Sequence, residues 1–181
     1  AFLTDSGAGQ PLGVLNAPAT VSVSKETGQA ANTIVYENVV KMWSRMWPRG
    51  HQNAVWVGNP DIMPALYSMN LAIGTAGVPV FMPANGAAPS ATLFGRPLLF
   101  SEKVPTLGTV GDLGLYDLTQ YAIGLRAEVA LMISPHAYFV SDELAFRLRV
   151  RIDGSSLWDA AVTPAKGSNT ISPFVVLATR A

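Results

Sequence analysis

Residues that could do chemistry are few and scattered. The chain has two histidines, His51 and His136, and no cysteine, so it has no thiol nucleophile, no Cys-ligated metal and no paired-histidine zinc motif. Carboxylates such as Asp112, Asp117, Asp142 and Glu143 are scattered, with nothing to predict that any two of them meet, and the GxSxG motif of a serine hydrolase is absent. We therefore expect no catalytic, cofactor-binding or metal site. The enzymatic alternative is a small hydrolase that pairs a histidine with a nearby carboxylate.

The clearest charge pattern is FRLRVRIDG, which places Arg147, Arg149 and Arg151 at every second position. Alternation predicts a strand from Glu143 to Asp153 with one apolar and one charged face. Carboxylates at both ends nearly balance the charged face, and a phosphate-binding surface gains nothing from them. We therefore predict that these five charged side chains form cross-strand or cross-subunit ion pairs. A nucleic-acid-binding ribbon is the alternative.

The composition predicts a chain that hides much of its surface against other protein. Only 13% of its 181 residues are charged, against about 25% in typical soluble domains, and the mean hydropathy is +0.29. No apolar run reaches the roughly 18 residues of a membrane span, so we expect no membrane association. The net charge is zero, whereas a free-standing nucleic-acid binder usually has a basic excess.

Residues 62–95 contain no charged residue and no histidine. Interface cores are depleted in charge, so such a loop is expected to pack against a neighbouring molecule. Pro83, Asn85, Pro89 and Phe94 are the candidate contact residues of this segment. A flexible loop without a role is the alternative.

The order of predicted elements is typical of an α+β fold with a mixed sheet and a few helices. A helix is predicted over 35–47, capped by Asn32 or Thr33, with Val39, Val40 and Trp43 on its apolar stripe. A second helix begins near residue 59. Strands are predicted at 20–24, 54–57, 97–100, 111–116, 120–126, 143–153, 157–162 and 174–178, with a turn at DGSS, weak alternation at 127–133 and His136 in a loop between strands.

Five motifs, in order, resemble tailed-bacteriophage major capsid proteins of the Hong Kong 97 type. FLTDSGAGQPLGVLN resembles the segment after that family's spine helix, and AVWVGNPDIMPAL resembles its strand and Asn-Pro helix start. LFGRPLLFSEKVP resembles its Gly-x-Pro strand, and GDLGLYDLTQYAIGLR its Gly-Asp and Tyr-x-Ile-Gly strands. FRLRVRIDG resembles its long peripheral strand, which precedes a last strand such as FVVLATR.

The resemblance implies a shell subunit with an axial and a peripheral subdomain. Residues 1–32 and 127–162 are then expected to be peripheral, 33–126 axial, and 163–181 to return to the axial subdomain; the loop near residue 83 would point at the capsomer axis. The implied partners are copies of the chain in pentamers and hexamers, with scaffold and portal proteins besides. The shell would enclose double-stranded DNA without reading its sequence, as a virion capsid assembled in the bacterial cytoplasm.

The resemblance covers the later two-thirds of such a subunit. The family's N-terminal arm, extended loop and most of its spine helix precede the first matching segment. Some relatives join subunits through a lysine on that loop and a peripheral asparagine. Because Asp142 stands near the position of that asparagine, we expect no such cross-link. The alternative within this fold is an encapsulin-like compartment shell.

Overall fold

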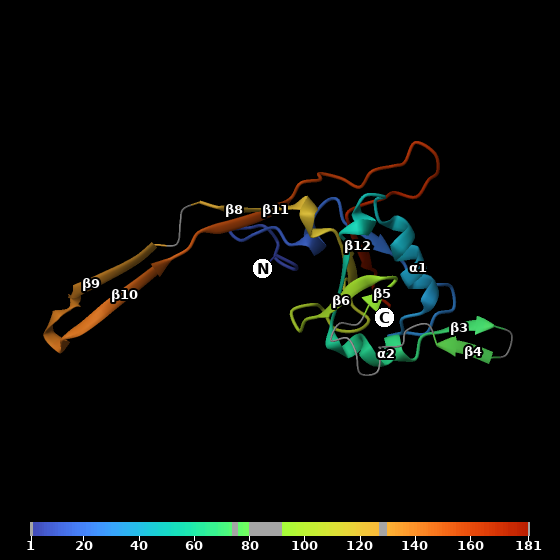
Figure 1. Ribbon diagram of the computed structural model, residues 1–181, viewed down its shortest axis with the longest axis horizontal. Coiled ribbons are helices and arrows are strands. Elements are labelled where there is room, and N and C mark those ends of the chain that lie inside the picture. Colours follow the sequence, from blue (N-terminus) through green and yellow to red (C-terminus); the bar gives the residue numbers. More distant parts are fainter. Residues whose placement is uncertain (1, 74–75, 80–91, 127–129, 181) are drawn as a thin grey trace.

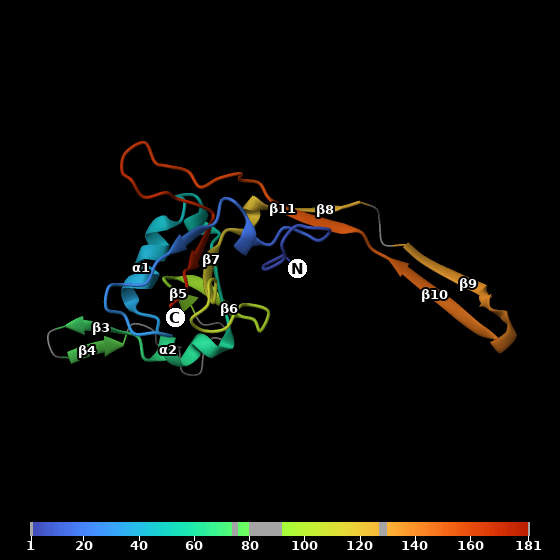
Figure 2. The same ribbon diagram turned by 180° about the vertical axis from the view of Figure 1, so that it is seen from behind.

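The computed structural model describes residues 2–73, 76–79, 92–126 and 130–180. These residues form a packed core from which a long, narrow arm of paired strands projects, and Figures 1 and 2 show the two parts from opposite sides. The core contains both helices and sheet, which confirms the α+β prediction.

A six-stranded sheet is the centre of the core, with the strand order β1-β12-β7-β2-β6-β5. Its strands are β1 (Val21–Val23), β2 (Val55–Gly58), β5 (Thr92–Leu93), β6 (Arg96–Phe100), β7 (Leu113–Tyr116) and β12 (Phe174–Leu177). The sheet is mixed, as expected, because β1 runs parallel to β12 and β2 parallel to β6, while the other pairs are antiparallel. A separate small hairpin is formed by β3 (Asn70–Ile73) and β4 (Ala76–Pro79).

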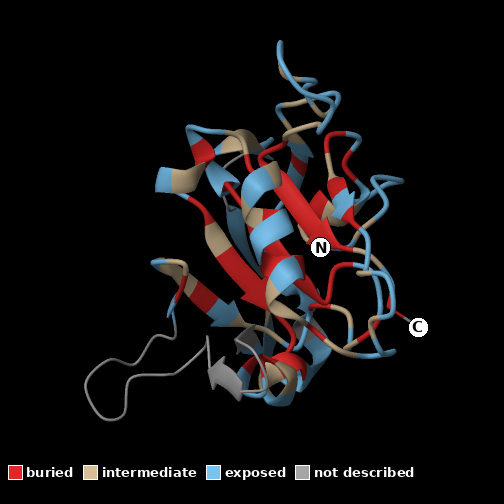
Figure 3. Cartoon of the chain, turned by 90° about the vertical axis from the view of Figure 1, so that its right-hand side faces the viewer, coloured by how far each residue is buried: buried red, intermediate tan, exposed pale blue. Residues whose placement is uncertain are grey.

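Both faces of this sheet are covered, so its central strands are apolar along their whole length. Every residue of β7 and β12 is buried. The first face carries Trp56, Leu115 and Val175 and packs against helix α1 (Tyr36–Arg45) and the short α2 (Met63–Tyr67). The opposite face carries Tyr116 and Phe174 and packs against the segment near η1 (Val14–Asn16). Figure 3 shows buried residues gathered in these strands and on the helix face that meets them.

Helix α1 differs from its prediction at its cap and along its stripe. Val35, not Asn32 or Thr33, is the N-cap, and the Asn38 side chain accepts a hydrogen bond of 3.2 Å from the Val35 backbone N–H. Met42 is buried, whereas Val40 is 39% exposed. The buried face follows Val39 and Met42 toward Met46, at the spacing of three and four residues that one helix face requires.

A fully buried ion pair ties the C-terminal end of the chain to the sheet. Arg180 donates to the Asp112 carboxylate, and the side chains of both residues are inaccessible to solvent. The other Asp112 contacts are backbone N–H groups, of Gly108 and Leu113, each at 2.8 Å. Arg180 also donates to the carbonyl of Thr33 at 2.7 Å. The pair therefore fixes the turn before β7, the strand end after β12 and the segment before α1 together.

The arm consists of two consecutive antiparallel strand pairs. Its base pairs β8 (Tyr121–Leu125) with β11 (Ile152–Ser156), and its outer part pairs β9 (Ala130–Tyr138) with β10 (Glu143–Arg149). A 3-10 turn, η5 (Phe139–Ser141), joins the outer strands at the tip. Two further 3-10 turns, η2 (Gly50–Gln52) and η3 (Pro60–Ile62), lie in the core, and η4 (Leu118–Gln120) leads into the arm.

Four predictions for this region were wrong. The single strand over 143–153 is interrupted at residues 150–151, and DGSS is not a turn, because β8 supplies hydrogen-bonding partners for β11 as far as Ser156. Residues 157–162 form no strand; only Val162 makes a bridge, to Ile171. His136 lies within β9 rather than in a loop.

Candidate assembly surfaces

One face of the outer arm is a continuous apolar surface that is open to solvent. The strand register places Phe146 opposite Ile133 and Leu148 opposite Leu131, so all four side chains share this face. They are 64%, 57%, 65% and 59% exposed, respectively. We call these four residues the apolar arm face.

An arm of this kind does not bury enough surface to be stable by itself. An isolated two-stranded hairpin is at best marginally stable in water. Monomeric soluble proteins rarely expose contiguous apolar surface of this sort, which usually marks a contact with other protein. Sequence alternation predicts the β10 side of this face, but the β9 side depends on the pairing register and was missed. The hydrophobic signal available there was only the weak alternation at 127–133.

The predicted charged residues of the arm lie on its opposite face. Arg147 is paired with Met132 and Arg149 with Ala130, so β9 offers neither arginine a cross-strand carboxylate. Within the described residues, neither side chain forms an ion pair. The cross-strand ion pairs predicted for these two arginines are therefore not formed with β9. The cross-subunit ion pairs stay a prediction.

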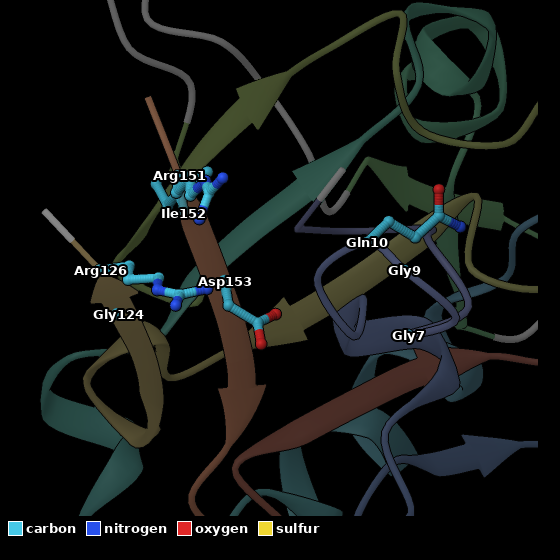
Figure 4. Close-up of a pocket in the computed structure, with 8 residues that line it drawn as sticks. All are labelled: Gly7, Gly9, Gln10, Gly124, Arg126, Arg151, Ile152 and Asp153. Atoms are coloured by element: carbon cyan, nitrogen blue, oxygen red, sulfur yellow. The ribbon is translucent and has the colours of Figure 1, made fainter. Parts of the chain in front are cut away.

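Arg151 and Asp153 lie at the base of the arm, beside a hollow of about 310 Å³. Figure 4 shows Asp153 on β11 and Arg151 directly before it. Arg126 lies at the end of the neighbouring strand, and Gln10 lies on the opposite wall of the hollow. Glu143, the remaining predicted charge, lies at the far end of the arm, at the start of β10. The structure thus separates Glu143 from Asp153 and adds Arg126, which sequence reasoning did not select.

A second hollow, of about 300 Å³, lies where the arm joins the core. Its lining is apolar and includes Phe2, Leu118 and Ile123. Leu118 is 49% and Ile123 57% exposed. This hollow adds exposed apolar surface at the base of the arm, and only the strand prediction over 120–126 pointed to it.

Of the candidates in the uncharged stretch, Pro83, Asn85 and Pro89 lie outside the described residues. Phe94 is among the described residues. It lies in the turn between β5 and β6 and has a left-handed backbone conformation, with φ of 49°. Its ring lies 5.7 Å from Trp43 and 6.0 Å from Tyr36, measured between ring centroids. Phe94 therefore packs on α1 of its own chain and is half-buried.

The two histidines are placed apart and in different surroundings. The His51 ring packs on Trp43 at a centroid distance of 4.4 Å, and its Nδ1 atom is buried without a hydrogen-bond partner. Burial, and secondarily the nearby Arg96 charge, lowers the pKa of His51 below its usual 6.5. His136 is exposed on the arm. The described residues hold no group of three or more side chains suited to a metal ion.

Two of the carboxylates considered for chemistry, Asp112 and Asp117, have structural contacts instead. Asp117 is buried and accepts hydrogen bonds from the Trp47 indole at 3.0 Å and from Thr119 at 2.6 Å. Asp112 is held in the ion pair described above. Of the helices in the described ranges, none is long and apolar enough to cross a membrane.

The fold, a core sheet with helices on one face and a projecting arm, is similar to that of solved capsid chains. The chain superposes on the capsid chain of an empty GTA particle, computed with C5 symmetry, with a TM-score of 0.69 and 20% identity. The match covers 100% of this chain and 60% of that one, and the capsid of the native GTA particle gives the same values. The chain therefore spans 60% of the length of these two capsid chains.

The sequence itself identifies the family. A model of the phage capsid family matches residues 1–167, so the chain belongs to that family. This confirms the resemblance to phage major capsid proteins, and family and fold together point to a structural protein. A search of curated proteins finds no match.

Proposed function

We propose that this chain forms part of the repeating subunit of a closed icosahedral shell that encloses double-stranded DNA. In this proposal, the six-stranded core lies toward the capsomer axis and the arm lies at the periphery. The observation that carries the proposal is the exposed apolar arm face, which calls for a cover that the described chain does not supply. Membership of the phage capsid family supports the same reading.

The energetics of the arm favour repeated association. Complete burial of one large apolar side chain contributes about 1.5–3 kcal/mol. Each of the four residues of the apolar arm face has more than half of its side chain left to bury. Covering them contributes on the order of 5 kcal/mol per subunit before the cost of association. That contribution, repeated around a shell, favours a closed particle over free subunits.

We propose that DNA is enclosed rather than bound by a dedicated site. The chain has a net charge of zero, so it offers no basic surplus for the counterion release that drives tight DNA binding. Scaffold and portal proteins are the further partners in this proposal. The particle would assemble in the bacterial cytoplasm and become the virion capsid.

The test replaces Phe146 with Ser in the full-length protein that contains this chain. Association is followed by size-exclusion chromatography with light scattering, and Phe146→Leu is the matched control because it keeps an apolar side chain. We expect Phe146→Ser to leave the subunit folded by circular dichroism and to reduce the yield of large particles. Unchanged particle yield in Phe146→Ser would contradict a role of the apolar arm face in assembly.

A further inference from the structure

We propose that the acidic tip of one arm docks onto an arginine pair at the base of the arm in a second copy of the chain. The tip residues are Asp142 and Glu143, and the base residues are Arg126 and Arg151. This inference rests on the proposed shell function and adds which two surfaces meet. It follows from unpaired charges of opposite sign at the two ends of one projecting element.

The base holds two like charges in direct opposition. Leu125 pairs with Ile152, so the next position of the ladder places Arg126 opposite Arg151, and the Arg126 N–H donates to the Arg151 carbonyl at 3.1 Å. Like charges directly opposite each other on a strand pair are destabilising. Both side chains are exposed, and among the described residues neither forms an ion pair.

One carboxylate, Asp153, lies beside the arginine pair and does not neutralise it. Its Oδ1 atom accepts a hydrogen bond of 2.8 Å from the Gly154 N–H, within its own strand. The charged side chains that line the hollow are thus two positive and one negative. One further carboxylate would balance the net positive charge of the base, and the hollow has space for it.

The shape of the base allows a side chain from outside to reach the arginines. Gly7 and Gly9 form part of the wall, with φ angles of 82° and 71°. Both angles favour glycine, and no atom lies within 4 Å of where a Cβ on Gly9 would stand. The open hollow of about 310 Å³ is large enough for one acidic side chain. Figure 4 shows the arginines on one side and the glycine turn on the other.

The tip presents the complementary charge. Asp142 adopts a left-handed conformation, with φ of 56°, where the turn enters β10. It stands next to Glu143, and both are exposed. Residues 130–146 contain no lysine or arginine, so no lysine or arginine of the outer hairpin up to that point competes for these carboxylates.

Tip and base cannot meet within one arm. Figures 1 and 2 show them at opposite ends of it. The seven residues of β10 alone span about 23 Å at about 3.3 Å per residue, which exceeds the screening length of about 8 Å at physiological salt. The contact must therefore join two copies. It uses different surfaces on the two partners, and such contacts repeat into rings or open chains.

The test is a charge swap in the full-length protein. We expect Asp142→Lys with Glu143→Lys, and separately Arg126→Glu with Arg151→Glu, to slow particle formation by at least about tenfold in light scattering, because like charges then face each other. All four changes in one chain restore the opposite signs and should recover most of the wild-type rate. A four-fold variant that assembles no faster than the double variants would overturn the proposal.

Cysteine trapping gives an independent readout, because the natural chain contains no cysteine. Glu143→Cys with Arg151→Cys should yield disulfide-linked oligomers in assembled particles under mild oxidation. Glu143→Cys with Lys103→Cys, which pairs the tip with an exposed site on the core, is the control and should not. Particles that form normally without cross-links would overturn the docking but leave the shell function standing. Failure of the wild-type protein to form particles at all would count against the shell function itself.

A nucleic-acid role for the arginine pair is the competing outcome. Fluorescence anisotropy with double-stranded DNA should give equal affinities for wild type and for Arg126→Glu with Arg151→Glu. If the reversal weakens DNA binding while leaving the assembly rate unchanged, the pair binds phosphate and the proposed contact is overturned.

Discussion

Replacing Asp112 with Asn should destabilise the subunit more than the loss of an ordinary hydrogen bond does. The carboxylate faces Arg180 and two backbone N–H groups, all buried. An amide whose oxygen keeps the bond to the Leu113 N–H turns its own N–H donors toward both the Gly108 N–H and Arg180, which share the other carboxylate oxygen. The guanidinium is then a buried charge without a counter-charge.

The expected cost is about 3–5 kcal/mol, the range found when one partner of a buried ion pair is removed. That is a large share of the roughly 5–15 kcal/mol that stabilises a typical domain. Urea unfolding of the unassembled full-length subunit, followed by tryptophan fluorescence, would measure it. With a slope of about 2 kcal/mol per molar urea, the unfolding midpoint should fall by about 1.5–2.5 M.

The control is Lys103→Ala, which removes the ion pair with Glu102. Those two side chains are 77% and 79% exposed, and such surface pairs contribute about 0–1 kcal/mol. A loss in Asp112→Asn no larger than the loss in Lys103→Ala would refute the claim that this pair anchors the C-terminal end of the chain to the sheet.

Three further predictions concern the core. Burial lowers the pKa of His51, so below pH 6.5 the folded state binds fewer protons than the unfolded state. The stability of the fold should therefore fall as the pH drops below 6.5. In urea titrations at several pH values, His51→Gln should flatten this dependence. Burial raises the pKa of Tyr116, so stability present below pH 10 should decline as the pH rises above it; a Tyr116→Phe variant that declines as steeply would contradict this. A Cβ on Gly114 would overlap the Tyr116 ring, whereas one on Gly124 meets nothing within 4 Å; calorimetry should show Gly114→Ala losing about 1–3 kcal/mol and Gly124→Ala far less.

The core was largely predictable because its elements are locally encoded. The apolar runs that became β2, β7 and β12 have both sheet faces covered, and burial on both faces leaves a strong local signal. The contact between Asp112 and Arg180 joins residues 68 positions apart, and nothing local marks either as a partner. The extension of β11 through DGSS likewise depended on β8, because a paired strand overrides the turn preference of Asp-Gly.

The sequence predicted which types of surface the arm carries, but not which residues complete them. Alternation identified the arginines and the apolar side of β10, and the scarcity of charge indicated hidden surface. The residues that complete these surfaces, Ile133 opposite Phe146 and Arg126 opposite Arg151, follow from strand register. A shift of one residue would turn each to the other face. Register was set by tertiary pairing and could not be read from the sequence.

Electron microscopy of the full-length protein tests the central claim most directly. Negative-stain images of protein purified after expression, and of the same protein under conditions that promote assembly, should show hollow icosahedral particles. A subunit that stays monomeric under all such conditions would contradict the account.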